Sequence, residues 1–226
     1  MNSPPAQKVN GLIDGIAVLQ ELAMADGPVS NKEIAEKLGV NKVRANRLLK
    51  TLAYVGLASI DGARKYSIGP GVHVLAAQSM KASGLFQQAL PVLKRLTETG
   101  KTVALGVLWK GLVCYIYHNG RGGTEFLAGV DSKVFPAQNS SIGAVLLSRI
   151  DEADWPIQVD RRSSFYKSAK KAKVTGIAEL FFKDHISMAV PTGSAGIAAV
   201  AISGVTPDED IKSYRKMLRI AASEIK

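Results

Sequence analysis

The stretch SNKEIAEKLGVNKVRANRLLKTL leaves few folds open to the N-terminal part of this chain. Ser30 and Glu33 have the spacing of a capping box, in which the serine hydroxyl accepts a backbone N–H and the glutamate reaches back to the N-cap. Gly39 follows the apolar positions of this helix and suits the left-handed conformation in which many helices end. After Val40, Asn41 is typical of the N-cap of a second helix. Two helices joined by a short turn that contains glycine predict a helix-turn-helix.

A helix before this pair and a hairpin after it extend the pattern. Apolar residues at helical spacing predict a helix over about residues 9–25. The stretch LASIDGARKYSIG predicts a hairpin that turns at Asp61-Gly62, with Arg64 and Lys65 beside its tip. Three helices followed by a hairpin are the winged form of the helix-turn-helix, and basic residues at the tip of a wing would contact phosphate.

The rest of the chain changes character after the hairpin. Residues 1–69 form the predicted winged domain, and apolar positions at helical spacing predict a linker helix over residues 70–84. Short apolar strands, glycine turns and helices follow in residues 85–226. They end in a helix that Thr206 is expected to cap, with Pro207 at its first position. The sequence therefore predicts an α+β fold in which the second domain is mixed α/β, with helices that flank a mostly antiparallel sheet.

The second helix of the pair carries a basic face, which can be either an ordinary solvated surface or a DNA-reading surface. Arginine can bond guanine and asparagine can bond adenine in the major groove, so Arg44, Asn46 and Arg47 are the expected base readers. Val43 would pack on a thymine methyl group. The capped helix before this face and the wing after it favour DNA binding over the solvated alternative. The predicted set, with the lysines and the wing assigned to phosphates, is Asn41, Lys42, Val43, Arg44, Asn46, Arg47, Lys50, Arg64 and Lys65.

Charge and cysteine content agree with this interpretation. The formal net charge of +10 and the isoelectric point near 9.7 favour a polyanionic partner. Cys114 is the single cysteine, so neither an internal disulfide nor a zinc cluster is expected, and a reducing cytoplasm fits. We find no signal peptide and no apolar run long enough for a bilayer, so no membrane partner is expected. Residues 160–173 contain six basic residues and one acidic residue, which is typical of a solvated segment or of a second nucleic-acid patch.

No enzyme motif stands out in the second domain. The chain lacks Gly-x-Ser-x-Gly, a phosphate-binding glycine loop and His-Glu-x-x-His. His73, His118 and His185 lack metal-ligand spacing and are expected to be surface or core residues. We therefore expect no catalytic residue, no metal and no cofactor. The rival hypothesis is a small-molecule-binding protein or enzyme that carries a vestigial DNA-binding domain.

Five segments, in this order, resemble the IclR family of bacterial transcriptional regulators. They are SNKEIAEKLGVNKVRANRLLKTLAYVGL, KYSIGPGVHVLA, PVLKRLTETGKTVALGVLWKGLVCYIYHN, PAQNSSIGAVLL and ISMAVPTGSAGIAAVAISG. The resemblance covers nearly the whole chain. It implies a GAF-like effector-binding domain, operator binding that a small molecule modulates, and a homodimer or a tetramer built as a dimer of dimers. The family includes repressors and activators.

The same resemblance places an effector pocket in the second domain. The residues that it implies there are Ser140, Ser141, Ile142, Gly143, Glu179, Ser187 and Ser203. Serine hydroxyls and free N–H groups at a helix start suit a carboxylate, so the expected effector is a small organic acid, with an apolar or aromatic body as one option. Alternatively, Ser140 and Ser141 only cap a helix.

Two positions depart from the family pattern. Val43 and Arg44 stand where relatives commonly carry a serine and a threonine, which predicts a different operator preference. Ser187 stands where some relatives have a cysteine, and the only acidic residues expected near the implied pocket are Glu179 and Asp184. The effector is therefore less constrained by the sequence than the DNA-binding surface is.

Overall fold

The computed structural model describes residues 5–120, 125–127 and 135–226. The chain divides into two compact units, Asn2–Ala82 and Ser83–Lys226. Within the described residues, the helices are too short or too polar to cross a membrane.

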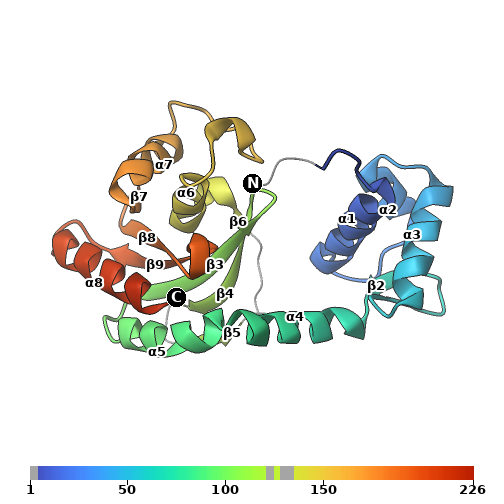
Figure 1. Ribbon diagram of the computed structural model, residues 1–226, viewed down its shortest axis with the longest axis horizontal. Helices are drawn as coiled ribbons and strands as arrows, with labels where there is room; N and C mark the ends of the chain where they lie inside the picture. The colour runs from blue at the N-terminus through green and yellow to red at the C-terminus, as the bar shows by residue number, and fades with distance from the viewer. Residues whose placement is uncertain (1–4, 121–124, 128–134) are drawn as a thin grey trace. The chain divides into compact units, whose positions relative to one another are not determined.

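The N-terminal unit is a three-helix bundle with a small antiparallel hairpin (Figure 1). Val29 extends the hairpin, because it exchanges two backbone hydrogen bonds of 2.8 and 2.7 Å with Tyr66. The core lies between the helices and the hairpin, with Ile34, Ala45 and Leu49 fully buried. The elements are α1 (Asn10–Met24), α2 (Asn31–Leu38), α3 (Lys42–Tyr54), β1 (Ala58–Ile60), β2 (Tyr66–Ile68) and α4 (Pro70–Ser83).

The caps that the sequence predicts around the turn between α2 and α3 are confirmed. The Glu33 N–H donates to the Ser30 hydroxyl at 3.2 Å, and the Ser30 N–H donates to the Glu33 carboxylate at 2.7 Å. Gly39 has a φ of 63°, in the left-handed region. The Asn41 side chain accepts the Arg44 N–H at 2.8 Å, so α3 begins immediately after this residue.

The hairpin forms where predicted, but its turn is wider than an Asp-Gly pair. The Asp61 carboxylate accepts the N–H groups of Ala63 at 2.9 Å and Lys65 at 2.8 Å. Arg64, rather than Gly62, takes the positive φ, of 59°. The Asp61 carboxylate satisfies the N–H groups on both sides of Arg64, which favours the left-handed conformation there.

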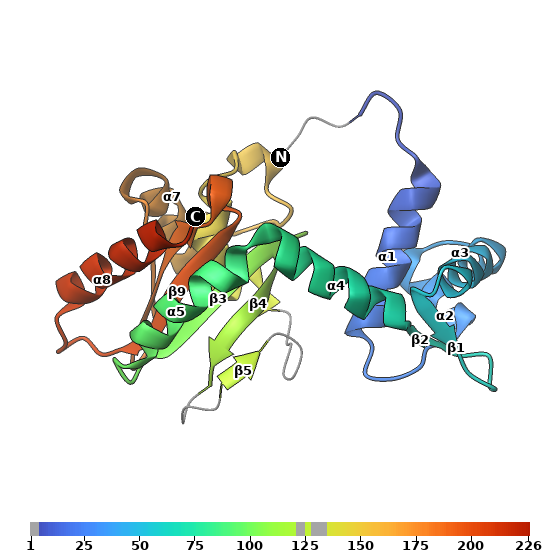
Figure 2. The same ribbon diagram turned by 60° about the horizontal axis from the view of Figure 1, so that its bottom comes forward.

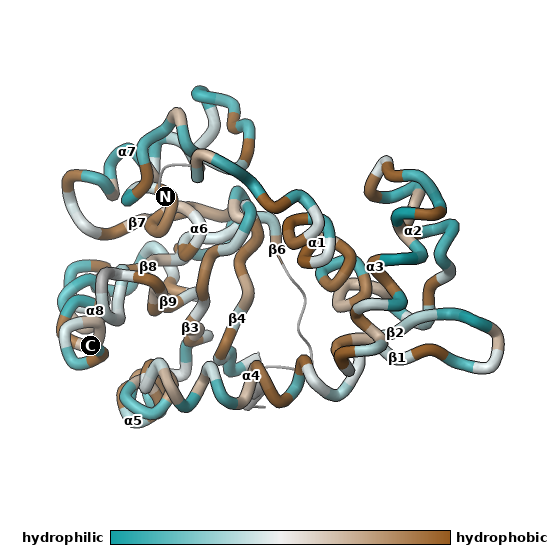
Figure 3. Tube along the Cα trace, turned by 45° about the vertical axis from the view of Figure 1, so that its right-hand side comes forward, coloured by the Kyte–Doolittle hydropathy of each residue, from teal (hydrophilic) through white to brown (hydrophobic). Residues whose placement is uncertain are grey.

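The C-terminal unit is an antiparallel sheet in the order β5-β4-β3-β9-β8-β7, with β6 paired to β4. Helices α6 and α7 cover one face and α5 and α8 the other (Figure 1), and β5 lies beside β4 at one edge (Figure 2). The strands β8 and β9 are largely hydrophobic (Figure 3). Among the short apolar strands predicted for residues 85–226, the one over residues 124–130 lies partly outside the described residues. The strands are β3 (Thr102–Trp109), β4 (Leu112–Asn119), β5 (Glu125–Leu127), β6 (Phe135–Pro136), β7 (Ala178–Phe181), β8 (Ile186–Thr192) and β9 (Ala198–Val205), and the helices are α5 (Leu85–Thr97), α6 (Ser141–Leu147), α7 (Ser164–Thr175) and α8 (Ile211–Glu224).

The predicted α+β architecture is confirmed, but the predicted start of the last helix is wrong. Thr206 does not cap α8; the helix begins at Ile211, and the Asp210 carboxylate accepts the N–H groups of the next turn at 3.0 and 3.3 Å. The Glu209 carboxylate accepts the Thr206 N–H at 2.8 Å and binds Lys101 Nζ at 2.6 Å. These bonds close residues 206–209 into a turn, and Pro207, predicted at the first helical position, lies before the helix.

We expect Glu209 to stabilise the folded state in a way that is lost in acid. The hydrogen bond from Lys101, and then those from the Thr206 N–H and the Tyr214 hydroxyl, lower the pKa of Glu209 to about 2 from an ordinary 4.5. Because the folded-state pKa is lowered, this contribution is present above pH 4.5 and is lost as the pH falls toward 2. Glu209→Gln should therefore flatten the fall of Tm between pH 5 and about 2 in a scanning-calorimetry series.

The matched control is Asp26→Asn, which removes a carboxylate from the exposed turn after α1. It removes one negative charge, as Glu209→Gln does, so the difference between the two variants isolates the contribution of the turn. Equal pH profiles for Glu209→Gln and the wild type would contradict the stabilising role of the turn.

Candidate nucleic-acid interface and effector hollow

Helix α3 presents a basic stripe away from the core of the N-terminal unit. Ala45, Leu49 and Leu52 are buried and anchor the helix against α1 and α2. On the opposite side, Val43 is 70% exposed and Arg47 is exposed as well. Lysines 42 and 50 flank this stripe and are also exposed, whereas Asn46 is half-buried. The geometry leaves a convex surface with cationic and short polar side chains, as the major groove of DNA requires.

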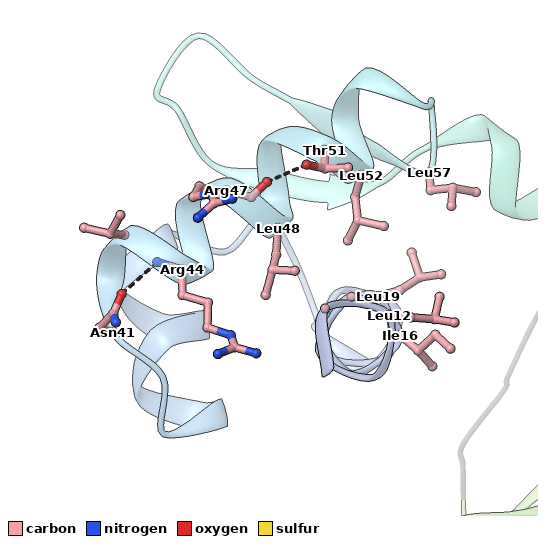
Figure 4. Close-up of a pocket in the computed structure, with 13 residues that line it drawn as sticks. Leu12, Ile16, Leu19, Asn41, Arg44, Arg47, Leu48, Thr51, Leu52 and Leu57 are labelled. Atoms are coloured by element: carbon pink, nitrogen blue, oxygen red, sulfur yellow. Dashed lines mark hydrogen bonds between the residues drawn. The ribbon is translucent and has the colours of Figure 1, made fainter. Parts of the chain in front are cut away.

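Arg44 lies apart from the other predicted base readers. Its guanidinium pairs with the Asp14 carboxylate of α1. Figure 4 shows its side chain directed toward the space between α3 and α1. The described residues provide no ion-pair partner for Arg47. Sequence patterns along α3 could not reveal this difference, because the partner of Arg44 lies on another helix.

The tip of the wing carries the two predicted phosphate contacts. Arg64 and Lys65 are both exposed. The turn around them is held by the Asp61 carboxylate, so the cations project from a bonded loop. The stripe on α3 and this tip both belong to the N-terminal unit, and together they form the candidate nucleic-acid interface.

An apolar groove of about 750 Å³ separates α1 from α3. Leu12, Ile16 and Leu19 form its α1 wall, and Leu48 and Leu52 form its α3 wall (Figure 4). Helix α1 has the predicted bounds within one residue, yet Leu12 is 63% and Ile16 40% exposed. Part of the apolar face of α1 therefore lies outside the core of this unit.

A hollow of about 150 Å³ lies in the C-terminal unit between the start of α6 and the sheet. Five of the predicted effector residues line it: Ser140, Ser141, Ile142, Ser187 and Ser203. The Ser141 and Ser187 hydroxyls are 2.9 Å apart, and the Ser140 hydroxyl lies 3.3 Å from the Tyr115 hydroxyl. Ser140 occupies the N-cap position without a side-chain capping bond, so its hydroxyl faces the hollow rather than the helix.

Gly143 and Glu179 do not line this hollow. A Cβ on Gly143 would lie 2.1 Å from the Ala137 carbonyl oxygen, so the glycine allows α6 to pack against the preceding turn. Glu179 pairs in register with Met188 and so lies on the opposite face of the sheet from Ser187. Glu179 therefore lies outside the implied pocket. Cations of two helices hold its carboxylate instead.

The Glu179 carboxylate is buried at the edge of the sheet. It accepts hydrogen bonds from Arg215 Nε at 2.5 Å, Arg215 Nη2 at 3.0 Å and Lys171 Nζ at 3.1 Å. Burial on its own raises the pKa of Glu179, but the bonds from Arg215 and Lys171 outweigh this and hold the pKa below its ordinary value. Glu179 is therefore a charged structural group that joins α7 and α8.

The hollow also contains residues that sequence reasoning missed. His118, His185, Tyr115 and Phe182 line it, although the histidines were expected to be surface or core residues. His185 stacks on Phe182 with ring centroids 4.7 Å apart, and its Nδ1 lies 2.7 Å from the Asp184 carboxylate. For His185, the strand periodicity was a signal in the sequence. Side chains two positions apart lie on the same face of a strand, and His185 precedes Ser187 by two positions.

Comparisons with known proteins agree with this architecture. Residues 14–62 match the model of the IclR helix-turn-helix domain. The HTH-type transcriptional regulator BhcR of Paracoccus denitrificans is 33% identical over 102 residues, which are 44% of this chain. The match spans 36% of that curated relative, so the chain covers about a third of its length.

Two solved structures share the fold at low sequence identity. An IclR family transcriptional regulator from Brucella abortus matches 100% of this chain and 94% of its own, with a TM-score of 0.79 and 20% identity. An IclR homolog from Microbacterium hydrocarbonoxydans, complexed with 4-hydroxybenzoate, matches 95% of this chain and 97% of its own, with a TM-score of 0.66 and 20% identity. Residues 14–62 are thus similar to an IclR helix-turn-helix domain, and the chain shares the fold of solved IclR regulators.

Proposed function

We propose that this chain is a DNA-binding transcriptional regulator whose operator binding is modulated by a small organic acid. The observation that carries the proposal is the exposed stripe of Val43, Arg47 and Lys50 on α3, beside a wing tipped by Arg64 and Lys65. In this proposal Arg47 and Asn46 read base edges and Val43 packs on a thymine methyl group. The lysines and the wing bind phosphates and set the register of the helix on DNA. The homologous domain in regulators supports the same conclusion.

The proposal is tested by an operator titration at several salt concentrations, with the operator selected from random duplexes. Specific binding with a steep salt dependence supports a regulator, whereas equal, weak binding to all duplexes favours the vestigial-domain hypothesis. Lys65→Ala should weaken binding to all sequences similarly and reduce the slope of log K against log salt by about 1. Lys8→Ala, before α1, serves as the control. A loss confined to one operator sequence would contradict a phosphate role for Lys65.

The hollow supports an acidic effector. Hydroxyl and imidazole groups line it, and none of its described lining residues is acidic. Such donors bind a carboxylate, and an IclR homolog was crystallised with 4-hydroxybenzoate. The volume of about 150 Å³ favours a small polar acid over one with a large apolar body.

Ser187→Ala is expected to remove most of the rise in Tm that an active acid produces. The substitution removes a hydroxyl that lies 2.9 Å from Ser141 and faces the hollow. A thermal-shift screen of small organic acids identifies the ligand, and Ser223→Ala, on the exposed side of α8, is the control. Stabilisation by a neutral ligand, with no response to any carboxylate, would refute the acidic effector.

Two copies of the chain would suit a palindromic operator. Helix α4 has no buried residue, and Val74 and Leu75 are each 54% exposed. This exposed apolar surface of α4 supports assembly through the N-terminal units, as a dimer or a dimer of dimers. Light scattering of the full chain measures the mass that decides between these states.

A further inference from the structure

Helix α8 carries basic residues on one outer face. Lys212, Arg215, Lys216 and Arg219 follow the three- and four-residue spacing of neighbours on a helix and line one shallow groove of about 450 Å³. We call these four residues the α8 basic face. Ile220 is the single apolar residue of the groove lining. The face is therefore a row of cations without an apolar centre.

This positive charge is only partly compensated. Glu179 binds Arg215, and it is shared with Lys171 of α7. Arg219 donates to the Thr175 carbonyl oxygen at 3.0 Å, which is a neutral group. Lys212 and Lys216 are exposed and form no ion pair with any residue that the structure describes. Cations four residues apart on a helix repel one another, so the face favours a bound polyanion.

The basic run at residues 160–173 differs from this face, although it is richer in lysine and arginine. Most of it forms α7, which Ser163 caps through the Tyr166 N–H at 3.1 Å. Most of its cations have carboxylate partners, which fits a solvated helix rather than a free patch. The pairs are Arg161–Glu152, Lys170–Glu152, Lys171–Glu179 and Lys173–Asp151.

The excess positive charge of the chain is not confined to the winged unit. Residues 83–226 contain 19 of the 29 lysines and arginines but 13 of the 19 acidic residues. The formal net charge of that part is therefore +6, against +4 for the first 82 residues. The C-terminal part of the chain therefore contributes to the positive charge that attracts a polyanion.

We infer that the α8 basic face is a second DNA-binding surface, which binds the phosphate backbone without reading sequence. The inference rests on the proposed function, because DNA is the polyanion that the winged unit would bring close. Protein interfaces are depleted of charge at their centre and enriched in aromatic and apolar anchors, whereas four cations and one apolar residue, Ile220, line this groove. Phosphate contacts need only lysine and arginine, and they release counterions.

The test uses the full chain and a 20-base-pair duplex that lacks the operator. Lys212→Glu/Lys216→Glu is expected to raise the apparent Kd on the order of tenfold at low salt and to reduce the salt slope by about 2. Lys212→Ala/Lys216→Ala, a milder pair, should reduce the slope by a similar amount. The control is Lys94→Glu/Lys183→Glu, which makes the same change in net charge at exposed residues outside the face. Thermal unfolding confirms that each variant is folded.

An equal loss in the control would overturn the inference, because it would show a response to net charge alone. Unchanged DNA binding, with binding to polyglutamate lost instead, would overturn it in favour of an acidic protein partner. The proposed function has a separate readout. If the wild type fails to discriminate the operator from other duplexes, the regulator proposal fails, while the difference between the face variants and the control still decides the inference.

Discussion

Gly143→Ala is expected to lower the free energy of unfolding of the C-terminal unit by about 3 kcal/mol. The added Cβ would lie 2.1 Å from the Ala137 carbonyl oxygen and 2.7 Å from two other backbone atoms of that residue. Backbone cannot rotate away as a flexible side chain can, so the first turn of α6 must shift. Alanine would gain about 0.5–1 kcal/mol over glycine from helix propensity, which is too little to offset this clash.

Denaturant unfolding followed by near-ultraviolet circular dichroism measures the effect. Gly27→Ala is the matched control, because a Cβ there meets open space, and it should change stability by less than about 0.5 kcal/mol. The experiment also separates two roles for Gly143. Unchanged stability with loss of the effector response would support the pocket role that the family resemblance implies and would contradict the packing role.

The winged unit was predictable because its signals are local in sequence. Ser30 bonds Glu33 and Asn41 bonds Arg44, each across three residues, and Gly39 needs only its own φ. Such caps depend on the chain within one helical turn, so a sequence contains all the information they require. The strands of the second domain were likewise visible from short apolar runs between glycine turns.

Sequence reasoning is incomplete where a residue meets a partner that is distant in sequence. Arg44 has the spacing of a base reader, but its guanidinium forms an ion pair with Asp14 of α1. Glu179 has the chemistry of a pocket acid, but the register of β7 with β8 turns it to the other face. Thr206 has the pattern of a helix cap, but Glu209 binds its N–H and ties the segment to Lys101. Neither helical nor strand periodicity in the sequence indicates these contacts.

The pair of arginines on α3 gives the largest expected effect on DNA binding. Arg47→Ala should weaken operator binding by about 1–3 kcal/mol and relax the preference at one base pair, because the exposed guanidinium can bond guanine O6 and N7. Arg44→Ala should cost less, because Arg44 must first leave Asp14 to reach a base. Fluorescence anisotropy with the operator and its single-base variants, at one salt concentration, measures both.

Asp14→Asn decides what Arg44 contributes, since it releases the guanidinium without altering α3. If the ion pair keeps Arg44 away from the bases, operator affinity should rise when Asp14 is neutralised, and the rise should vanish in the Asp14→Asn/Arg44→Ala double variant. An unchanged affinity would mean that the ion pair also holds α3 against α1 in the DNA-bound state.

For Arg47→Ala, a uniform loss of affinity across all duplexes would assign Arg47 to a phosphate. Base reading by Arg47 would then be excluded, and the sequence specificity of this helix would have to come from Val43 and Asn46.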